Sequence, residues 1–155
     1  MKKFLLFVFA PLVLLTSCSK DKFDAEKQAA ADDAAIKAYI GTDAAYHATA
    51  DGSGVYYKIV TQGTGANPAI TSTVKVTYTG KLLDGTSFDS GTITKPLSGL
   101  IAGWKSGLPY IKTGGRIILV IPSREGYGNV AQNGIPKNSV LVFTIDLLSF
   151  TDTAN

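Results

Sequence analysis

The stretch VKVTYTGKLLDGTSFDS, residues 74–90, has the pattern of two strands joined by a tight turn. Apolar and polar residues alternate from 74 to 79, which is typical of a strand with one buried face. Asp84-Gly85 is a strong signal for a hairpin turn. The stretch therefore predicts an antiparallel hairpin. Its unusual residue is Asp89, a carboxylate that directly follows Phe88 on an otherwise apolar hairpin.

Further strand patterns lie on either side of this hairpin. Residues 55–59 and 141–147 also alternate between apolar and polar side chains, and residues 116–121 form a short apolar run. Runs of this length and pattern are typical of strands in an antiparallel sheet. The sequence therefore predicts one antiparallel sheet from residue 55 onward.

One short helix is expected between these strands. Trp104, Leu108 and Ile111 have the i, i+4 and i+7 spacing of residues on one helix face. Pro109 lies inside this segment, where it removes a backbone hydrogen bond and favours a kink. A sheet with one helix on a face is an α+β fold.

The N-terminal residues have the pattern of an export signal. Lys2 and Lys3 precede an apolar run over residues 4–15, which is followed by small residues and Cys18. A helix over this run would cover only about 18 Å of a hydrocarbon layer of about 30 Å, so a membrane span is not expected. Residues 15–18, Leu-Thr-Ser-Cys, resemble a bacterial lipobox, in which the cysteine carries the lipid. A plain secretory signal with an incidental cysteine is the alternative.

The segment after Cys18 is expected to be a spacer. Its Ala, Glu, Lys and Gln content favours a helix from about 24 to 40, with Gly41 as its end. The apolar stripe of this helix is weak, because Asp32-Asp33 occupy the positions one turn before Ile36. We therefore expect a solvated helix rather than a coiled-coil arm.

The length of 155 residues suits one domain with appendages. The expected organisation is a lipoprotein signal peptide (1–17), a lipid-anchored, partly helical spacer (18–54), a globular domain (55–150) and a short tail (151–155).

Composition excludes several classes of function. The net charge of +3 comes from 15 Lys and Arg against 12 Asp and Glu, and loss of Lys2 and Lys3 would leave 13 against 12, or +1. No basic stripe is present, so nucleic acid is not an expected partner. The single histidine, His47, lies before the predicted sheet, and one histidine excludes a histidine-based triad or multi-histidine metal site. No metal or cofactor is therefore expected.

Four motifs in order, VTYTGKLLDGTSFDS, LIAGWKSGL, IPSREGYG and GIPKNSVLVFTIDLL, resemble the FKBP family of macrolide-binding peptidyl-prolyl cis/trans isomerases. The resemblance covers about residues 55–150. It implies a five- to six-stranded antiparallel half-barrel sheet wrapped around one short helix, with an apolar pocket between them. It also implies a rim loop over residues 90–96 that is shorter than usual in the family.

The resemblance also implies a set of site residues. The expected catalytic residues are Tyr78, Asp89, Ile101 and Tyr127, and the expected substrate-binding residues are Phe88, Leu100, Trp104, Ile135 and Phe143. Within this set, Asp89 would accept a hydrogen bond from Tyr78 and would not act as a general base. Tyr127 and the Ile101 backbone N–H would hold the substrate, with Trp104 as the pocket floor.

The pattern alone leaves simpler interpretations open. Tyr78, Trp104 and Phe143 fit plain core positions, Asp89 fits a turn cap, and Tyr127 beside a glycine fits a loop brace. The joint set of motifs favours the functional interpretation.

The resemblance predicts a monomeric isomerase that rotates Xaa-Pro bonds in exported proteins of the cell envelope. Its partners would be proline-containing polypeptides, macrolide inhibitors and the membrane that holds its lipid anchor. The alternative is a chaperone or binding module that holds proline-containing segments without turnover.

Overall fold

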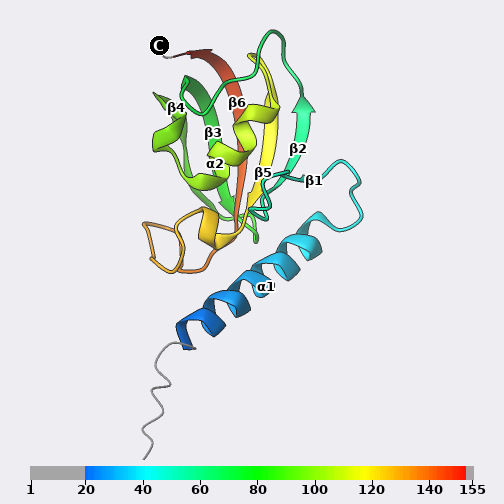
Figure 1. The fold of residues 1–155 in the computed structure, drawn as a ribbon, viewed down its shortest axis with the longest axis vertical. Coiled ribbons are helices and arrows are strands. Elements are labelled where there is room, and N and C mark those ends of the chain that lie inside the picture. Colours follow the sequence, from blue (N-terminus) through cyan, green and yellow to red (C-terminus); the bar gives the residue numbers. More distant parts are fainter. Residues whose placement is uncertain (1–19, 153–155) are drawn as a thin grey trace, which may run out of the picture.

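The computed structural model describes residues 20–152. The expected export signal and Cys18 lie outside the described residues. Figure 1 shows one curved sheet with the short helix α2 (Ala102–Gly107) across one face and the long helix α1 (Lys20–Ile40) at one end. In the described part of the chain, no helix has both the length and the apolar character needed to cross a membrane.

The sheet has six strands, all paired antiparallel, in the order β1-β2-β5-β6-β3-β4. The strands are β1 (His47–Ala48), β2 (Tyr56–Thr61), β3 (Thr73–Leu82), β4 (Ser87–Pro96), β5 (Arg116–Ile121) and β6 (Leu141–Thr151). The last strand in the chain, β6, lies between β5 and β3 and hydrogen-bonds to both. The expected α+β fold with five to six antiparallel strands is confirmed.

The predicted hairpin joins β3 to β4. At its turn the Thr86 N–H donates to Asp84 Oδ1 at 2.8 Å. Gly85 has a φ of 88°, which few residues other than glycine adopt. Residues 90–96, expected as a short rim loop, instead continue β4 and pair with β3 as far as Pro96. The loop prediction was wrong because most residues of this edge strand are exposed, so the strand lacks apolar alternation.

The helix around Trp104 is present but shorter than predicted. α2 ends at Gly107, and the chain continues as a single 3₁₀ turn, η2 (Leu108–Tyr110), with Pro109 at its start. Proline fits the first turn of a helix, because the N–H that it lacks has no helical partner there. Two further 3₁₀ turns, η1 (Leu97–Gly99) and η3 (Ser123–Glu125), precede α2 and follow β5.

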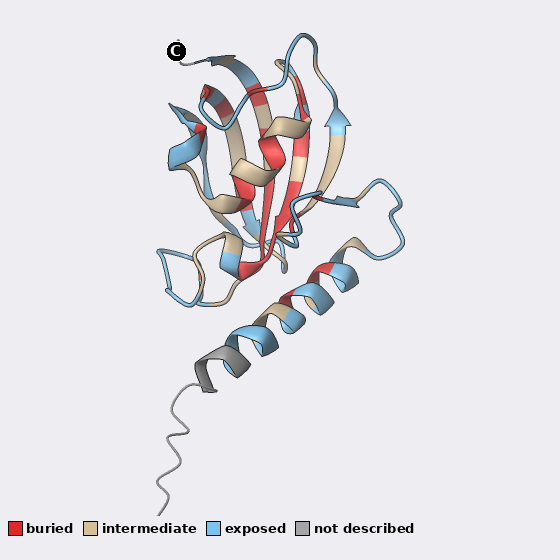
Figure 2. Cartoon of the chain, viewed as in Figure 1, coloured by how far each residue is buried: buried red, intermediate tan, exposed pale blue. Residues whose placement is uncertain are grey.

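The main core lies between α2 and the sheet, where Figure 2 shows the buried residues of both. α2 approaches β5 closely through two glycines. A Cβ on Gly103 would lie 2.5 Å from Ile121 Cγ2, and one on Gly107 would lie 2.4 Å from Leu119 Cδ2. This close approach brings Trp104, only 4% exposed, into the core.

A second, smaller core lies under α1. Ile36 is fully buried against Val120, Val140 and Val142. Asp32, one turn earlier, is only 3% exposed. The expectation of a helix solvated on all sides was therefore wrong. Ile36, the partly buried Ile40 and one buried carboxylate form this contact, and they create only a weak apolar stripe in the sequence.

Candidate functional site

The hairpin brings Tyr78 and Asp89 together. The Tyr78 hydroxyl donates a hydrogen bond to Asp89 Oδ2 at 2.7 Å, across the β3–β4 pair. Tyr78 is partly buried, whereas Asp89 is exposed. The carboxylate after Phe88 thus has a partner, as expected from the sequence, and this pair links the core to the surface.

Four aromatic rings pack edge to face behind this pair. The Trp104 ring centroid lies 5.2 Å from that of Tyr78 and 5.2 Å from that of Phe143, with interplanar angles of 75° and 84°. Phe88 meets Phe143 at 5.5 Å and 85°. Such perpendicular contacts are the favourable geometry for aromatic pairs. They fix the rings relative to one another.

Gly80 makes room for this cluster. A Cβ at Gly80 would lie 2.6 Å from the Phe88 ring and 2.8 Å from the Phe143 ring. The glycine of the Tyr-Thr-Gly motif is therefore required by the aromatic packing on strand β3.

The indole N–H of Trp104 is buried and has no hydrogen-bond partner among residues 20–152. Leaving such a donor unpaired costs about 1–3 kcal/mol. Unpaired buried donors are rare in folded proteins and call for an explanation, of which a functional role is one.

An open cavity of about 630 Å³ lies beside the aromatic cluster. Of the expected site residues, it is lined by Phe88, Asp89, Tyr127 and Ile135. Trp104, Phe143 and Ile135 belong to the buried core cluster, and Tyr78, Phe88 and Tyr127 pack against it. Trp104, Phe143 and Tyr78 do not line the cavity.

Leu100 and Ile101 lie at the start of α2, half-buried and packed against the same core. They do not line the cavity. Ile101 precedes the first turn, and its carbonyl accepts the Trp104 N–H at 3.0 Å. Its own N–H has no hydrogen-bond partner within the described part of the chain, so it is free to bind a ligand.

The family model for FKBP-type peptidyl-prolyl cis-trans isomerases matches residues 65–148, more than half of the chain. The chain belongs to this family. The FKBP-type isomerase FkpA of Aeromonas hydrophila is 41% identical over 107 residues, covering 66% of this chain and 40% of the relative. FkpA of Escherichia coli K12 is 46% identical over 101 residues, covering 62% and 37%. The chain thus spans about two fifths of the length of these curated relatives.

Solved structures agree with this family assignment. The crystal structure of FkpA from Escherichia coli aligns with a TM-score of 0.73 at 34% identity, covering 88% of this chain and 65% of that one. A peptidyl-prolyl cis-trans isomerase from Pseudomonas syringae pv. tomato aligns with a TM-score of 0.71 at 32% identity, covering 83% and 96%.

The phenols of this FKBP-type site resist ionisation. Burial, then the hydrogen bond and charge of Asp89, raises the pKa of Tyr78 to about 12. Burial and the charge of Asp89 also raise the pKa of Tyr127 above its ordinary value. Both hydroxyls are therefore protonated at neutral pH. The Tyr127 hydroxyl makes no hydrogen bond to any described residue and can donate to a bound molecule.

The cavity of this FKBP-type chain has a wall that the sequence did not indicate. Ala131, Gln132 and Asn133 line it, on a loop closed by two backbone hydrogen bonds between Gln132 and Ile135. Gly134 completes the turn with a φ of 75°. Polar loop residues have no periodicity, so the dipeptide Asn133-Gly134 was the one local signal of this turn.

Proposed function

We propose that this chain catalyses cis/trans rotation about Xaa-Pro bonds in exported proteins. The observation that carries the proposal is a cavity bordered by Phe88, Ile135 and the protonated phenol of Tyr127, with the Tyr78–Asp89 hydrogen bond beside it. Membership of the isomerase family supports the same activity.

The reaction needs an environment rather than a reactive group. Rotation about a peptide bond has a barrier of about 18–20 kcal/mol, because resonance is lost in the twisted state. The twisted amide is less dipolar than the planar one, so removing water from the bound peptide bond disfavours the planar ground state relative to the transition state. No covalent bond forms or breaks.

Each residue of the expected site has a proposed role, and of these residues Phe88, Asp89, Tyr127 and Ile135 line the cavity itself. Phe88 and Ile135 exclude water from the proline ring, and Trp104 is proposed as the rigid base of the aromatic cluster. Tyr127 donates a hydrogen bond to the substrate carbonyl, and the Ile101 N–H anchors the peptide. Asp89 orients the hairpin through Tyr78, while Leu100 and Phe143 complete the apolar surroundings.

The test is NMR exchange spectroscopy on an Ala-Leu-Pro-Phe peptide with and without the protein. We expect catalysed cis/trans exchange, and we expect Tyr127→Phe to lower it about tenfold by removing one transition-state hydrogen bond. Tyr39→Phe, at an exposed position on α1, is the matched control and should leave exchange unchanged.

Two outcomes of this test would contradict the proposal. Peptide binding without faster exchange would favour the alternative, a chaperone or proline-segment binding module. Equal exchange in wild type and Tyr127→Phe would remove Tyr127 from the mechanism.

A macrolide that competes with the peptide would place both in one pocket, whereas simultaneous binding would separate them.

We also propose that the chain is exported and held at a membrane of the cell envelope by lipid on Cys18. The support is the sequence of residues 1–18, with its basic, apolar and lipobox-like parts. The spacer of residues 18–54 would then lie between the lipid and the isomerase domain. Cys18→Ala should move the protein from the membrane to the soluble fraction of lysed cells. Membrane retention of this variant would exclude the anchor.

A further inference from the structure

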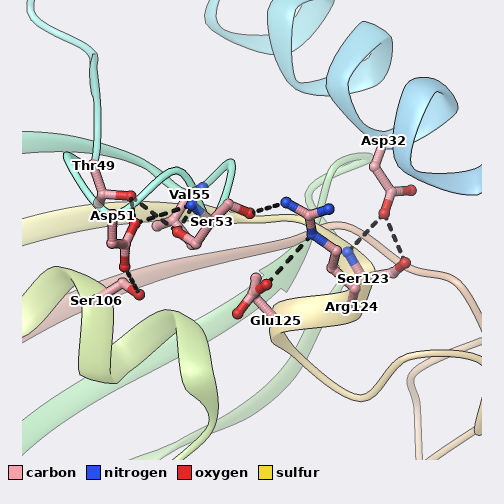
Figure 3. Close-up of polar contacts among 9 residues, drawn as sticks. All are labelled: Asp32, Thr49, Asp51, Ser53, Val55, Ser106, Ser123, Arg124 and Glu125. Carbon is pink, nitrogen blue, oxygen red and sulfur yellow. Dashed lines mark hydrogen bonds and ion pairs between the residues drawn. The ribbon is translucent and has the colours of Figure 1, made fainter. Parts of the chain in front are cut away.

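A carboxylate of helix α1 is buried against the turn that precedes Tyr127. Asp32 lies 91 positions before Ser123, and its Oδ2 accepts both the Ser123 N–H at 2.8 Å and the Ser123 hydroxyl at 2.7 Å. Its Oδ1 accepts from the Gln28 side-chain amide at 2.7 Å. Figure 3 shows the carboxylate pointing from α1 toward Ser123. Both oxygens therefore have partners, as a buried carboxylate requires.

Ser123 in turn is hydrogen-bonded to the backbone on both sides of Tyr127. The Ser123 carbonyl accepts the Gly126 N–H at 3.0 Å and the Gly128 N–H at 2.8 Å. These two glycines flank Tyr127 directly. The Gly128 carbonyl in turn accepts the Asn138 N–H at 2.8 Å, at the far end of the loop that lines the cavity. An unbroken series of hydrogen bonds thus connects α1 to both sides of Tyr127.

The same turn has a second link to the N-terminal segment. Arg124 Nη2 donates to the Ser53 carbonyl at 2.7 Å, and its Nε lies 3.4 Å from Glu125 Oε1 (Figure 3). Ile36, one turn after Asp32, fixes α1 against β5 and β6. The helix is therefore a docked element from which Asp32 can hold the η3 turn in one position.

The geometry of the contact favours a role beyond attachment. An apolar side chain at this position would also dock the helix, without the desolvation cost of a buried carboxylate. Two hydrogen bonds that the N–H and the O–H of one residue donate to the same oxygen are directional. They therefore fix the orientation of Ser123, whereas an apolar contact would fix only its distance from the helix.

We infer that Asp32 is a positioning residue for Tyr127. Through Ser123 it holds the backbone on both sides of this tyrosine, so that the phenol meets the carbonyl of a bound Xaa-Pro peptide. The inference rests on the proposed isomerase function for its kinetic readout. The N-terminal helix is then part of the site and not only a spacer.

Three variants of the full chain test this inference. We expect Asp32→Ala to lower kcat about tenfold with little change in KM, because small displacements remote from the reacting atoms cost up to about a hundredfold. Asp32→Asn should recover most of the activity, because its amide oxygen still accepts from Ser123 and Gln28 can turn its own amide to match. Asp33→Ala is the matched control, since Asp33 pairs with Lys37 on the same helix at 2.7 Å.

The second measurement is local and independent of turnover. In an NMR spectrum of Asp32→Ala, the Tyr127 ring signals and the amides of residues 123–128 should shift, while the Asp89 amide keeps its wild-type position. Kinetics are compared per folded molecule, with the folded fraction taken from the same spectra. If Asp32→Ala does not fold, Ser123→Ala replaces it, because this variant loses the hydroxyl donor and keeps the N–H.

The outcomes separate this inference from the proposed function. Wild-type protein without isomerase activity would refute the function, and the Tyr127 ring signals alone would then decide the inference. Unchanged ring signals in Asp32→Ala would overturn it. So would a loss of kcat that Asp32→Asn does not restore, or an equal loss in Asp33→Ala.

Discussion

Tyr78 contacts both the hydrophobic core and the candidate site. Its ring contacts Trp104 inside the molecule, and its oxygen donates to Asp89 at the surface. A phenylalanine would keep the ring contact and lose only the hydrogen bond. The two contributions are therefore separable by a single substitution.

We expect Tyr78→Phe to lower the free energy of unfolding by about 1 kcal/mol. This is the net contribution of one hydrogen bond whose acceptor, here Asp89, is accessible to water. Isomerase activity should fall as well, because Asp89 is no longer tied to the cluster. Urea denaturation with peptide exchange measures both, and Tyr39→Phe controls for the loss of any hydroxyl. No change in either quantity would mean that the bond contributes nothing in solution.

The ionisation of Tyr78 gives a prediction on pH. Its ordinary pKa of 10.0 is raised to about 12, so its contribution to stability is complete below pH 10 and is lost as pH rises through about 12. The pKa of Tyr127 is raised in the same direction. We therefore expect peptide exchange catalysed by the protein to be constant from about pH 6 to pH 9. A decline within this range would show that a phenol ionises earlier.

At the scale of elements, α2 packs closely on β5 because two of its residues are glycines. Gly103 and Gly107 face Ile121 and Leu119 at distances that leave no space for a methyl group. The aromatic cluster depends on this contact, because Trp104 follows the first of these glycines.

Gly103→Ala and Gly107→Ala should each lower the free energy of unfolding by about 1–3 kcal/mol through overpacking. This loss would occur although alanine favours a helix over glycine by about 1 kcal/mol. Gly99→Ala, where a Cβ would have no neighbour within 4 Å, is the control. Chemical denaturation measures the effect, and stabilisation by either core variant would mean that α2 moves away from β5 without cost.

Asp51 ties the segment before β2 to α2. Its Oδ2 accepts the Ser106 hydroxyl at 2.5 Å, and its Oδ1 accepts the Thr49 hydroxyl at 2.7 Å and the Ser53 N–H at 3.0 Å. Burial acts to raise the pKa of Asp51, but the hydrogen bonds from Ser106, Thr49 and Ser53 outweigh it and hold this pKa well below its ordinary value of 3.8. The charged form is thus the one that the fold stabilises.

Because the pKa is lowered on folding, Asp51 contributes stability above about pH 4 that is lost as pH falls further. We expect Asp51→Asn to be less stable than wild type at neutral pH, and the difference to shrink as the pH falls below 3.8. Denaturation curves at neutral and acidic pH measure this. A difference that stays constant with pH would exclude the charge as its source.

At the scale of the whole molecule, α1 packs on the sheet through Ile36 and is hydrogen-bonded to the η3 turn through Asp32. Ile36→Ala should lower the stability of this contact by about 2 kcal/mol or more, the usual cost of such a core truncation. Hydrogen exchange of the α1 amides should then be faster than in wild type. Tyr39→Ala, at a position that is 44% exposed, should leave these rates unchanged. Equal rates in both variants would mean that Ile36 does not hold the helix.

The sequence predicts those parts of the fold in which apolar and polar residues alternate or in which a turn dipeptide is present. The β3–β4 turn, β5, β6 and the Tyr78–Asp89 contact all follow from local patterns or from the family motifs. β4 beyond Ser90 could not be predicted, because its exposed polar residues lack alternation. Nor could the burial of Asp32, since its partner Ser123 lies 91 positions away and no local rule pairs them.

The central place of β6 also affects how the polypeptide reaches its native state. Until residues 141–151 have been synthesised, β1-β2-β5 and β3-β4 have no strand between them, because β6 alone joins the two groups. Pairings this distant along the chain form late and slowly. A nascent chain that lacks residues 141–151 can therefore form only the two separate strand groups, and the complete sheet forms only after these residues have been synthesised.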